Sequence, residues 1–270
     1  MADNGRAKVH ETAIVPAPSP LEPIDPGLLL RAYRSGIFPM ADSRDDAEVF
    51  WVEPRQRAIL PLDGFHLSTS LARTLRRGRF AVTCNADFAG VMRACAAPRQ
   101  TEGGETWISH RIEESYRQLH ALGHAHSIEC WQDGALAGGL YGVQFDRVFC
   151  GESMFSRVRD ASKVALACLV AALRLCGTQL LDCQFITAHL ASLGAVEIPQ
   201  RAYLERLRRA QRPYSAGAGA AGAADGDGDG LGAAAAAGTL PEGFAALLAG
   251  AASSSSSPGN FIAQSLTQTS

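Results

Sequence analysis

The sequence predicts an α+β protein in which packed helices cover a mixed β-sheet. Residues 127–143 contain two β-forming runs joined by Asp133-Gly134, a dipeptide typical of a two-residue hairpin turn. A further β-run at 148–155 leads into residues 161–176, a helical pattern that is apolar over most of its surface. Such a helix must be buried, and here the sheet can cover it. Another β-run, 179–185, follows it.

Composition limits the class of protein. The chain has 270 residues, enough for one large or two modest domains, and a net charge of −2, which predicts no general attraction to nucleic acid or membrane. Its seven cysteines are scattered through apolar runs without a CxxC pair, which is typical of reduced thiols. No stretch has the length of a membrane span, and the N-terminus lacks an apolar signal region. We therefore expect a cytoplasmic protein without membrane association.

The N-terminal part predicts a short helix and a brief strand. Asp25 can cap the helix, Pro26 suits its first turn and Gly36 can end it. Residues 57–62 can form the strand. The expected division of the chain is a disordered segment at 1–20, a small N-terminal domain at 21–62, a catalytic domain at 63–212 and a disordered low-complexity tail at 213–270.

The tail is rich in Ala, Gly, Asp and Ser, a composition that cannot bury a core. Thr239 and Glu242 resemble a capping box before a short apolar run. A helix of that length is marginal alone, so we expect at most a transient helix there.

A helix that begins at Ser68 carries the clearest basic patch of the chain. Arg73, Arg76 and Arg77 lie on or near its outer side, and Arg79 follows. Cations near a helix C-terminus are favourable on any solvated face. Guanidinium groups also suit phosphates, so this face is alternatively a phosphate-binding surface.

Three histidines cluster after an amphipathic helix expected from Ser109 or His110 to about residue 122. His120 and His124 are four residues apart, as metal ligands on a helix can be, and His126 follows. No carboxylate or cysteine completes a ligand set at suitable spacing. We therefore interpret them as helix-end cations and backbone partners, and we expect no metal site.

The acid Glu152 lies within the apolar run Phe149-Cys150-Gly151-Glu152-Ser153-Met154. Strand alternation predicts that Glu152 and Met154 point the same way. A carboxylate among such neighbours is costly to bury unless a polar or charged group meets it. The pattern leaves two interpretations open, an edge acid in water and a functional acid.

The order hairpin, strand, helix, strand is that of the acetyltransferase-like (GNAT) fold. Acyl-CoA enzymes of that fold usually have a glycine-rich turn before the helix, where backbone amides bind pyrophosphate. Residues 156–163 have no glycine there but contain Arg157, Arg159 and Lys163. This weakens an acetyl-CoA interpretation and favours a different anionic donor.

Many segments in the same order resemble leucyl/phenylalanyl-tRNA–protein transferases over residues 25–209. The matching stretches are YRSGIFPM, WVEPR, TWIS, LGHAHSIE, GGLYGV, FCGESMFSR, ASKVAL, DCQ and AHLASLGAVEIPQ. The resemblance implies a small N-terminal domain and a GNAT-like domain. It also implies transfer of Leu, Phe or Met from aminoacyl-tRNA to proteins with an N-terminal Arg or Lys, which marks them for N-end rule degradation. The donor is an activated ester, so we expect no cofactor, and we expect a monomer.

The resemblance also implies roles for the reacting groups. Gln184, paired with Asp182, would activate the acceptor amine, and their spacing on a strand puts them on one face. Glu152 would contact the amino group of the donor, as suits a carboxylate beside an ammonium.

The remaining roles concern binding of the donor. Met154 and Phe149 resemble walls of its side-chain pocket, and Trp51 and Trp107 resemble residues that flank the terminal adenosine. Arg73, Arg76 and Arg77 then become contacts to acceptor-stem phosphates.

The chain departs from the family pattern at two places. The segment around Trp51 has Phe50 and Glu53 where two tryptophans and a serine are more usual, and Thr187 stands where some members have Asn. Two rival functions are a small-molecule N-acyltransferase, which the missing glycine turn disfavours, and an RNA-binding module without catalysis, which needs neither Asp182 nor Gln184.

Overall fold

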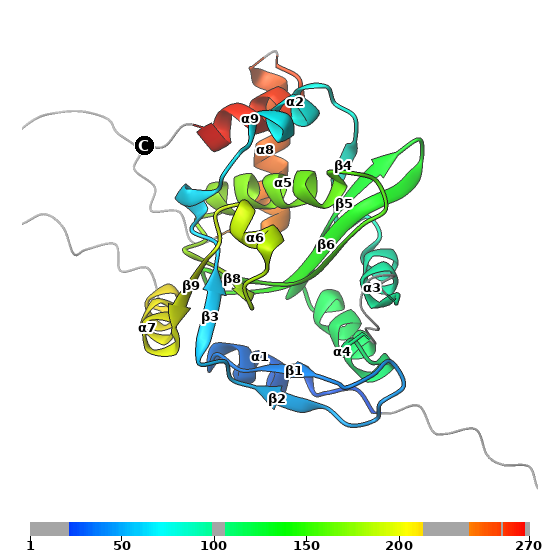
Figure 1. Ribbon diagram of the computed structural model, residues 1–270, viewed down its shortest axis with the longest axis vertical. Coiled ribbons are helices and arrows are strands. Elements are labelled where there is room, and N and C mark those ends of the chain that lie inside the picture. Colours follow the sequence, from blue (N-terminus) through cyan, green and yellow to red (C-terminus); the bar gives the residue numbers. More distant parts are fainter. Residues whose placement is uncertain (1–21, 99–105, 213–237, 255, 268–270) are drawn as a thin grey trace, which may run out of the picture.

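The computed structural model describes residues 22–98, 106–212, 238–254 and 256–267. It has a mixed seven-stranded sheet of order β4-β5-β6-β7-β8-β3-β9 (Figure 1). The strands are β3 (Gln56–Ile59), β4 (Ala81–Cys84), β5 (Ala125–Gln132), β6 (Ala135–Phe145), β7 (Val148–Ser156), β8 (Leu180–Gln184) and β9 (Val196–Pro199). A separate ribbon pairs β1 (Phe38–Met40) with β2 (Phe50–Val52).

Helices cover both faces of the sheet. They are α1 (Pro26–Arg34), α2 (Thr69–Arg76), α3 (Phe88–Ala96), α4 (His110–Ala121), α5 (Ala161–Leu175), α6 (Ala188–Ser192), α7 (Gln200–Gln211), α8 (Leu240–Ser253) and α9 (Pro258–Thr267), with a 3₁₀ turn η1 (Leu62–Gly64). One apolar core surrounds α5 and includes α2, α8 and α9. A second core, on the other side, includes α1, α3, α4 and α7.

The predicted hairpin, strand, helix and strand are confirmed. Asp133 and Gly134 both have positive φ, 51° and 75°, as their turn between β5 and β6 requires. α5 is buried along most of its length, as its apolar pattern predicts. The α+β class with a mixed sheet and packed helices therefore follows the sequence.

β7 and β8 pair in parallel over only a short length. Their register joins residues 148–150 to residues 180–182. Beyond Cys150 and Asp182 the two strands no longer pair, and the space between them becomes available to other side chains.

β3 belongs to the large sheet. It pairs antiparallel with β8 on one side and β9 on the other, whereas the expected division assigned residues 57–62 to the small N-terminal domain. β3 thereby places Arg57 beside β8.

The expectation of disorder in the tail is wrong for residues 240–253 and 258–267. They form α8 and α9, which pack on α5 and α2 (Figure 1). The capping box of Thr239 and Glu242 is present. The physical reason is tertiary: α5 is apolar all round, and its face away from the sheet needs cover, which a helix marginal alone can supply. The expected disorder of residues 1–20 and 213–237 lies outside the described residues.

Candidate active site

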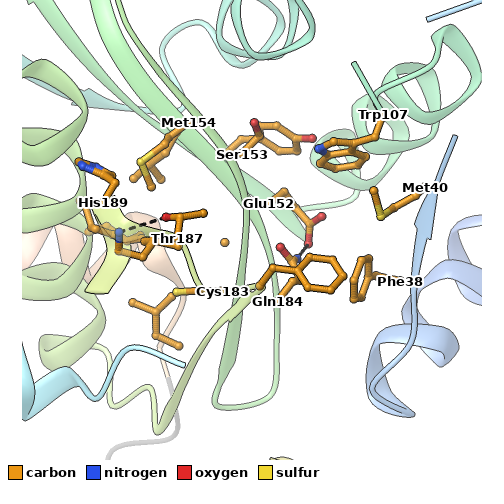
Figure 2. Close-up of a pocket in the computed structure, with 18 residues that line it drawn as sticks. Phe38, Met40, Trp107, Glu152, Ser153, Met154, Cys183, Gln184, Thr187 and His189 are labelled. Carbon is orange, nitrogen blue, oxygen red and sulfur yellow. Dashed lines mark hydrogen bonds between the residues drawn. The ribbon is translucent and has the colours of Figure 1, made fainter. Parts of the chain in front are cut away.

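A cavity of about 490 Å³ opens where β7 and β8 separate. Its walls come from β1, β6, β7, β8, α5 and α6 and are mainly apolar. Figure 2 shows Glu152 and Gln184 meeting at the cavity, with Trp107, Met40 and Phe38 on one side and Met154, Thr187 and His189 on the other. The cavity therefore combines an apolar chamber with a few polar groups, as small-ligand sites commonly do.

Glu152 is positioned by a β-bulge. In the β6–β7 ladder Tyr141 pairs with Ser153 and Gly142 pairs with Gly151, so Glu152 is the extra residue. Because of the bulge, Glu152 and Met154 point to opposite faces of the sheet. Glu152 reaches Tyr116 of α4, whereas Met154 packs against the core around α5. The expectation that Glu152 and Met154 share a face by simple alternation is therefore wrong.

The Glu152 carboxyl is buried, with 8% of the residue exposed, among neutral partners. It accepts a hydrogen bond from Gln184 Nε2 at 2.8 Å and another from the Tyr116 hydroxyl at 3.2 Å. Tyr116 in turn is hydrogen-bonded to Tyr33 from α1. Burial raises the pKa of Glu152 to about 8, because neutral donors offset only part of the desolvation.

Asp182 is buried too, but it has a cation as partner. Arg57 donates to it from Nε at 2.9 Å and from Nη2 at 2.6 Å, a two-pronged pair. The Tyr203 hydroxyl donates at 2.9 Å. Burial alone would lower the pKa of Arg57, but the Asp182 carboxylate holds it above its ordinary value.

Asp182 acts on Gln184 through the backbone. The backbone N–H of Gln184 donates to Asp182 Oδ1 at 2.9 Å, while the Gln184 side chain turns to Glu152. Gln184 has a φ of 57°, in the left-handed region that a residue with a side chain seldom adopts. This conformation ends the alternation of β8, so the two side chains do not form the direct pair that the sequence suggested.

Two family models match the chain. The model described as leucyl/phenylalanyl-tRNA protein transferase matches residues 59–208, and the model of its N-terminal domain matches residues 22–55. The chain belongs to the leucyl/phenylalanyl-tRNA protein transferase family.

Curated relatives agree with this assignment. A leucyl/phenylalanyl-tRNA–protein transferase of Novosphingobium aromaticivorans is 69% identical over 93% of this chain and 100% of its own length. Members of the family from Zymomonas mobilis and Rhodopseudomonas palustris are 58% and 56% identical over 71% and 72% of this chain, and over 71% and 86% of their own lengths. A solved structure of a conserved protein of unknown function from Staphylococcus epidermidis aligns with 66% of each chain at 12% identity and a TM-score of 0.36, too distant to define the fold family.

The binding residues that family resemblance suggested fall into two groups. Met154 and Trp107 line the cavity. Phe149 does not: it is fully buried in the core around α5, because it precedes the bulge and faces that helix. Trp51 lies on β2 with 41% of its surface exposed and is not among the cavity walls.

The arginines suggested as phosphate contacts for this family lie away from the cavity walls. Arg73, Arg76 and Arg77 are all exposed on α2 or at its end. Within the described residues none of them forms an ion pair, so their charges face solvent.

Sequence reasoning missed the groups that support this site of the transferase family. They are Arg57, Tyr33, Tyr116, Tyr203 and Tyr141. Tyr141 lines the cavity with a buried hydroxyl that finds no hydrogen-bond partner among the described residues. Each tyrosine lies in a sequence pattern that is equally typical of a residue in the hydrophobic core. Only Arg57, a charged residue at the start of an apolar strand, could have indicated a buried polar partner.

The histidine cluster has structural partners. His120 Nδ1 is 2.8 Å from the Ala125 carbonyl oxygen, as the backbone-partner interpretation predicts, and His126 is hydrogen-bonded to Asn85. Among the described residues no group of three or more His, Cys, Asp or Glu side chains is arranged to hold a metal ion. No helix in the described ranges is long and apolar enough to cross a membrane.

Proposed function

We propose that this chain transfers Leu or Phe, and also Met, from aminoacyl-tRNA to the α-amine of proteins that begin with Arg or Lys. Such transfer marks the acceptor for N-end rule degradation. The observation that carries the proposal is the Glu152–Gln184 hydrogen bond at the rim of an apolar cavity. A carboxyl that could hold the donor's amino group and an amide that could receive the acceptor's amine lie beside an apolar cavity, which supports the proposal.

The reaction needs positioning more than activation. The acceptor nitrogen attacks the ester carbonyl carbon, the C–N bond forms, and the C–O bond to the terminal ribose breaks with the electron pair going to that oxygen. The oxygen takes up the proton that the amine loses. Because the donor ester is already activated, orientation of the two substrates supplies much of the rate.

Gln184 is the group proposed to receive the acceptor amine. Its Nε2 donates to Glu152, which leaves the amide oxygen facing the cavity as an acceptor for an amine N–H. Asp182 fixes the Gln184 backbone by accepting a hydrogen bond from its N–H. In this assignment Asp182 is a positioning residue, because Arg57 already neutralises its charge.

Glu152 is proposed to hold the donor's amino group. In the free protein the described hydrogen-bond partners of the Glu152 carboxyl are a hydroxyl and an amide, neither of which is a cation. The donor's ammonium would supply the positive charge that stabilises the ionised carboxylate. Met154 and the leucines of α5 that line the cavity would hold the Leu or Phe side chain. Trp107 and the exposed Trp51 are proposed for the terminal adenosine, and Arg73, Arg76 and Arg77 for phosphates.

We extend the proposal to the finer features of the molecule. The separation of parallel β7 and β8 around a substrate cavity supports a GNAT-like catalytic domain. It would follow an N-terminal domain built around α1 and the β1–β2 ribbon. A cytoplasmic monomer that needs no cofactor completes this proposal.

A transfer assay tests the function. Purified protein is mixed with leucyl-tRNA and a peptide that begins with Arg, and a parallel reaction receives acetyl-CoA in place of the tRNA. We expect the leucyl peptide in the first reaction and no acetylation in the second. Acetylation alone would favour a small-molecule acyltransferase, and tRNA binding without transfer would favour an RNA-binding module.

A further inference from the structure

α8 and α9 lie beyond the residues that the family models match, which end at 208. They are nevertheless bound to the catalytic domain by specific contacts. The buried side chain of Gln144 on β6 donates to the Gly238 carbonyl at 3.2 Å and accepts from Leu240 N–H at 2.7 Å. A buried residue of the central sheet thus holds the start of α8.

α8 crosses α5 at close range (Figure 1). A Cβ placed on Gly243 would lie 2.3 Å from the Ala172 carbonyl oxygen, so glycine permits the approach. The apolar side chains Leu240, Phe244 and Leu247 join the core around α5. This contact covers the face of α5 that the sheet does not.

α9 makes the same kind of contact with α2. A Cβ on Gly259 would lie 1.8 Å from the Leu75 carbonyl oxygen, near the C-terminus of α2. Arg174 of α5 joins the neighbouring segments: Nη1 donates to the Ser265 carbonyl of α9 at 2.8 Å and Nε donates to the Leu62 carbonyl before α2 at 2.8 Å. The end of α2 is therefore held next to α9, and the turn that precedes α2 is tied to α9 through Arg174.

Three exposed positions of α2 and its C-terminal end carry Arg73, Arg76 and Arg77. Residues 240–267 contain no lysine or arginine and one acid, Glu242. The side chains of α8 and α9 therefore offer no cation that could contact phosphate, whereas α2, on which α9 packs, carries three.

We propose that α8 and α9 position α2 so that its three arginines engage phosphates of the donor tRNA together. The proposal rests on the proposed function, which supplies the tRNA. It adds to that function a positioning role for a C-terminal segment outside the matched family region. The reacting groups, on β7 and β8, are not part of it.

The test compares two donors with the Gly259→Val variant. Leucyl-tRNA carries the acceptor stem, whereas leucyl-adenosine carries the same ester without it. Valine at 259 forces α9 away from Leu75, so we expect KM for leucyl-tRNA to rise about tenfold. The slope of log KM against log salt should fall by about 1 for each phosphate that the arginines no longer neutralise. The kcat and KM with leucyl-adenosine should stay unchanged.

Two controls isolate the role of the arginines. Ala245→Val adds the same side chain on an exposed position of α8 and should change neither KM. In a protein that already has Arg73, Arg76 and Arg77 changed to Ala, Gly259→Val should add little to KM, because the two changes act through the same phosphate-binding surface.

Equal losses with both donors, or additive effects of the two changes on KM, would overturn the proposal. An Arg174→Gln variant gives a second route to the same answer if Gly259→Val does not fold, since it removes the bridge without adding volume. If the wild-type protein transfers from neither donor, the result contradicts the proposed function itself, on which this inference rests.

Discussion

Two buried acids on neighbouring strands, Glu152 and Asp182, have opposite environments. Asp182 is fully buried and paired with a buried arginine, a tyrosine hydroxyl and a backbone N–H. Glu152 is buried with an amide and a hydroxyl as its hydrogen-bond partners, and its pKa is raised to about 8. The difference fits the proposed roles: Asp182 has a complete ion pair that joins β3 to β8, whereas Glu152 has no cation among its hydrogen-bond partners in the described residues.

The largest expected effect is on stability, from breaking the complete pair. Asp182→Asn leaves Arg57 charged and buried without a counter-ion, which should lower the free energy of unfolding by about 3–5 kcal/mol. Urea denaturation measures it. The double variant Arg57→Met/Asp182→Leu should recover part of the loss, and equal losses in the single and double variants would contradict this account.

The next effect is on activity, from Glu152→Gln. The change keeps the shape and a hydrogen-bonding group but removes the charged partner of the donor's ammonium, so kcat/KM for transfer from leucyl-tRNA should fall about 100-fold. Urea denaturation at pH 7 should show no loss of stability, because burying an acid without a cation costs free energy. Full activity of Glu152→Gln would show that the Glu152 carboxyl has no role in the reaction.

The stability of the wild type and of Glu152→Gln should depend differently on pH. The folded-state pKa of Glu152 is about 8 against an ordinary value of 4.5, so between these values the folded protein holds a proton that the unfolded chain releases. This contribution to stability is complete below 4.5 and is lost as pH rises through about 8. The unfolding free energy of the wild type, minus that of Glu152→Gln, should therefore fall from pH 5 to pH 8, and a flat difference would contradict the raised pKa.

The smallest effects come from removing one hydroxyl beside each acid. Tyr203→Phe should cost about 1 kcal/mol of stability and leave kcat unchanged, because Asp182 keeps its other partners. Tyr116→Phe should instead move the pKa of Glu152 further up, because its hydrogen bond lowers that pKa. A pH profile of kcat/KM should shift for Tyr116→Phe and stay unchanged for Tyr203→Phe. The same shift in both variants would contradict the different environments of Glu152 and Asp182.

The sequence could predict the strands around the site because each has strong local signals. The Asp133-Gly134 turn and the apolar pattern of residues 161–175 identify their elements without tertiary information. The bulge at Glu152 and the left-handed φ of Gln184 could not be predicted. Neither residue type demands that geometry, which arises from neighbouring strands and from the hydrogen bond to Asp182.

The supporting cluster was missed for a similar reason. Arg57 is separated from Asp182 by 125 residues, and no local pattern joins them. The tail offered a better signal. A helix apolar all round, such as α5, requires cover on two faces, while the sheet supplies one; the capping box at Thr239 then marks where the second cover begins.

The packing of α8 and α9 on α5 also has a consequence for synthesis of the protein. α5 is made well before them, and α8 and α9 are the last of the described helices to leave the ribosome. Until then the face of α5 that α8 and α9 cover exposes apolar side chains, the kind of surface that chaperones bind. The nascent chain therefore completes the core around α5 only after α8 and α9 have been made.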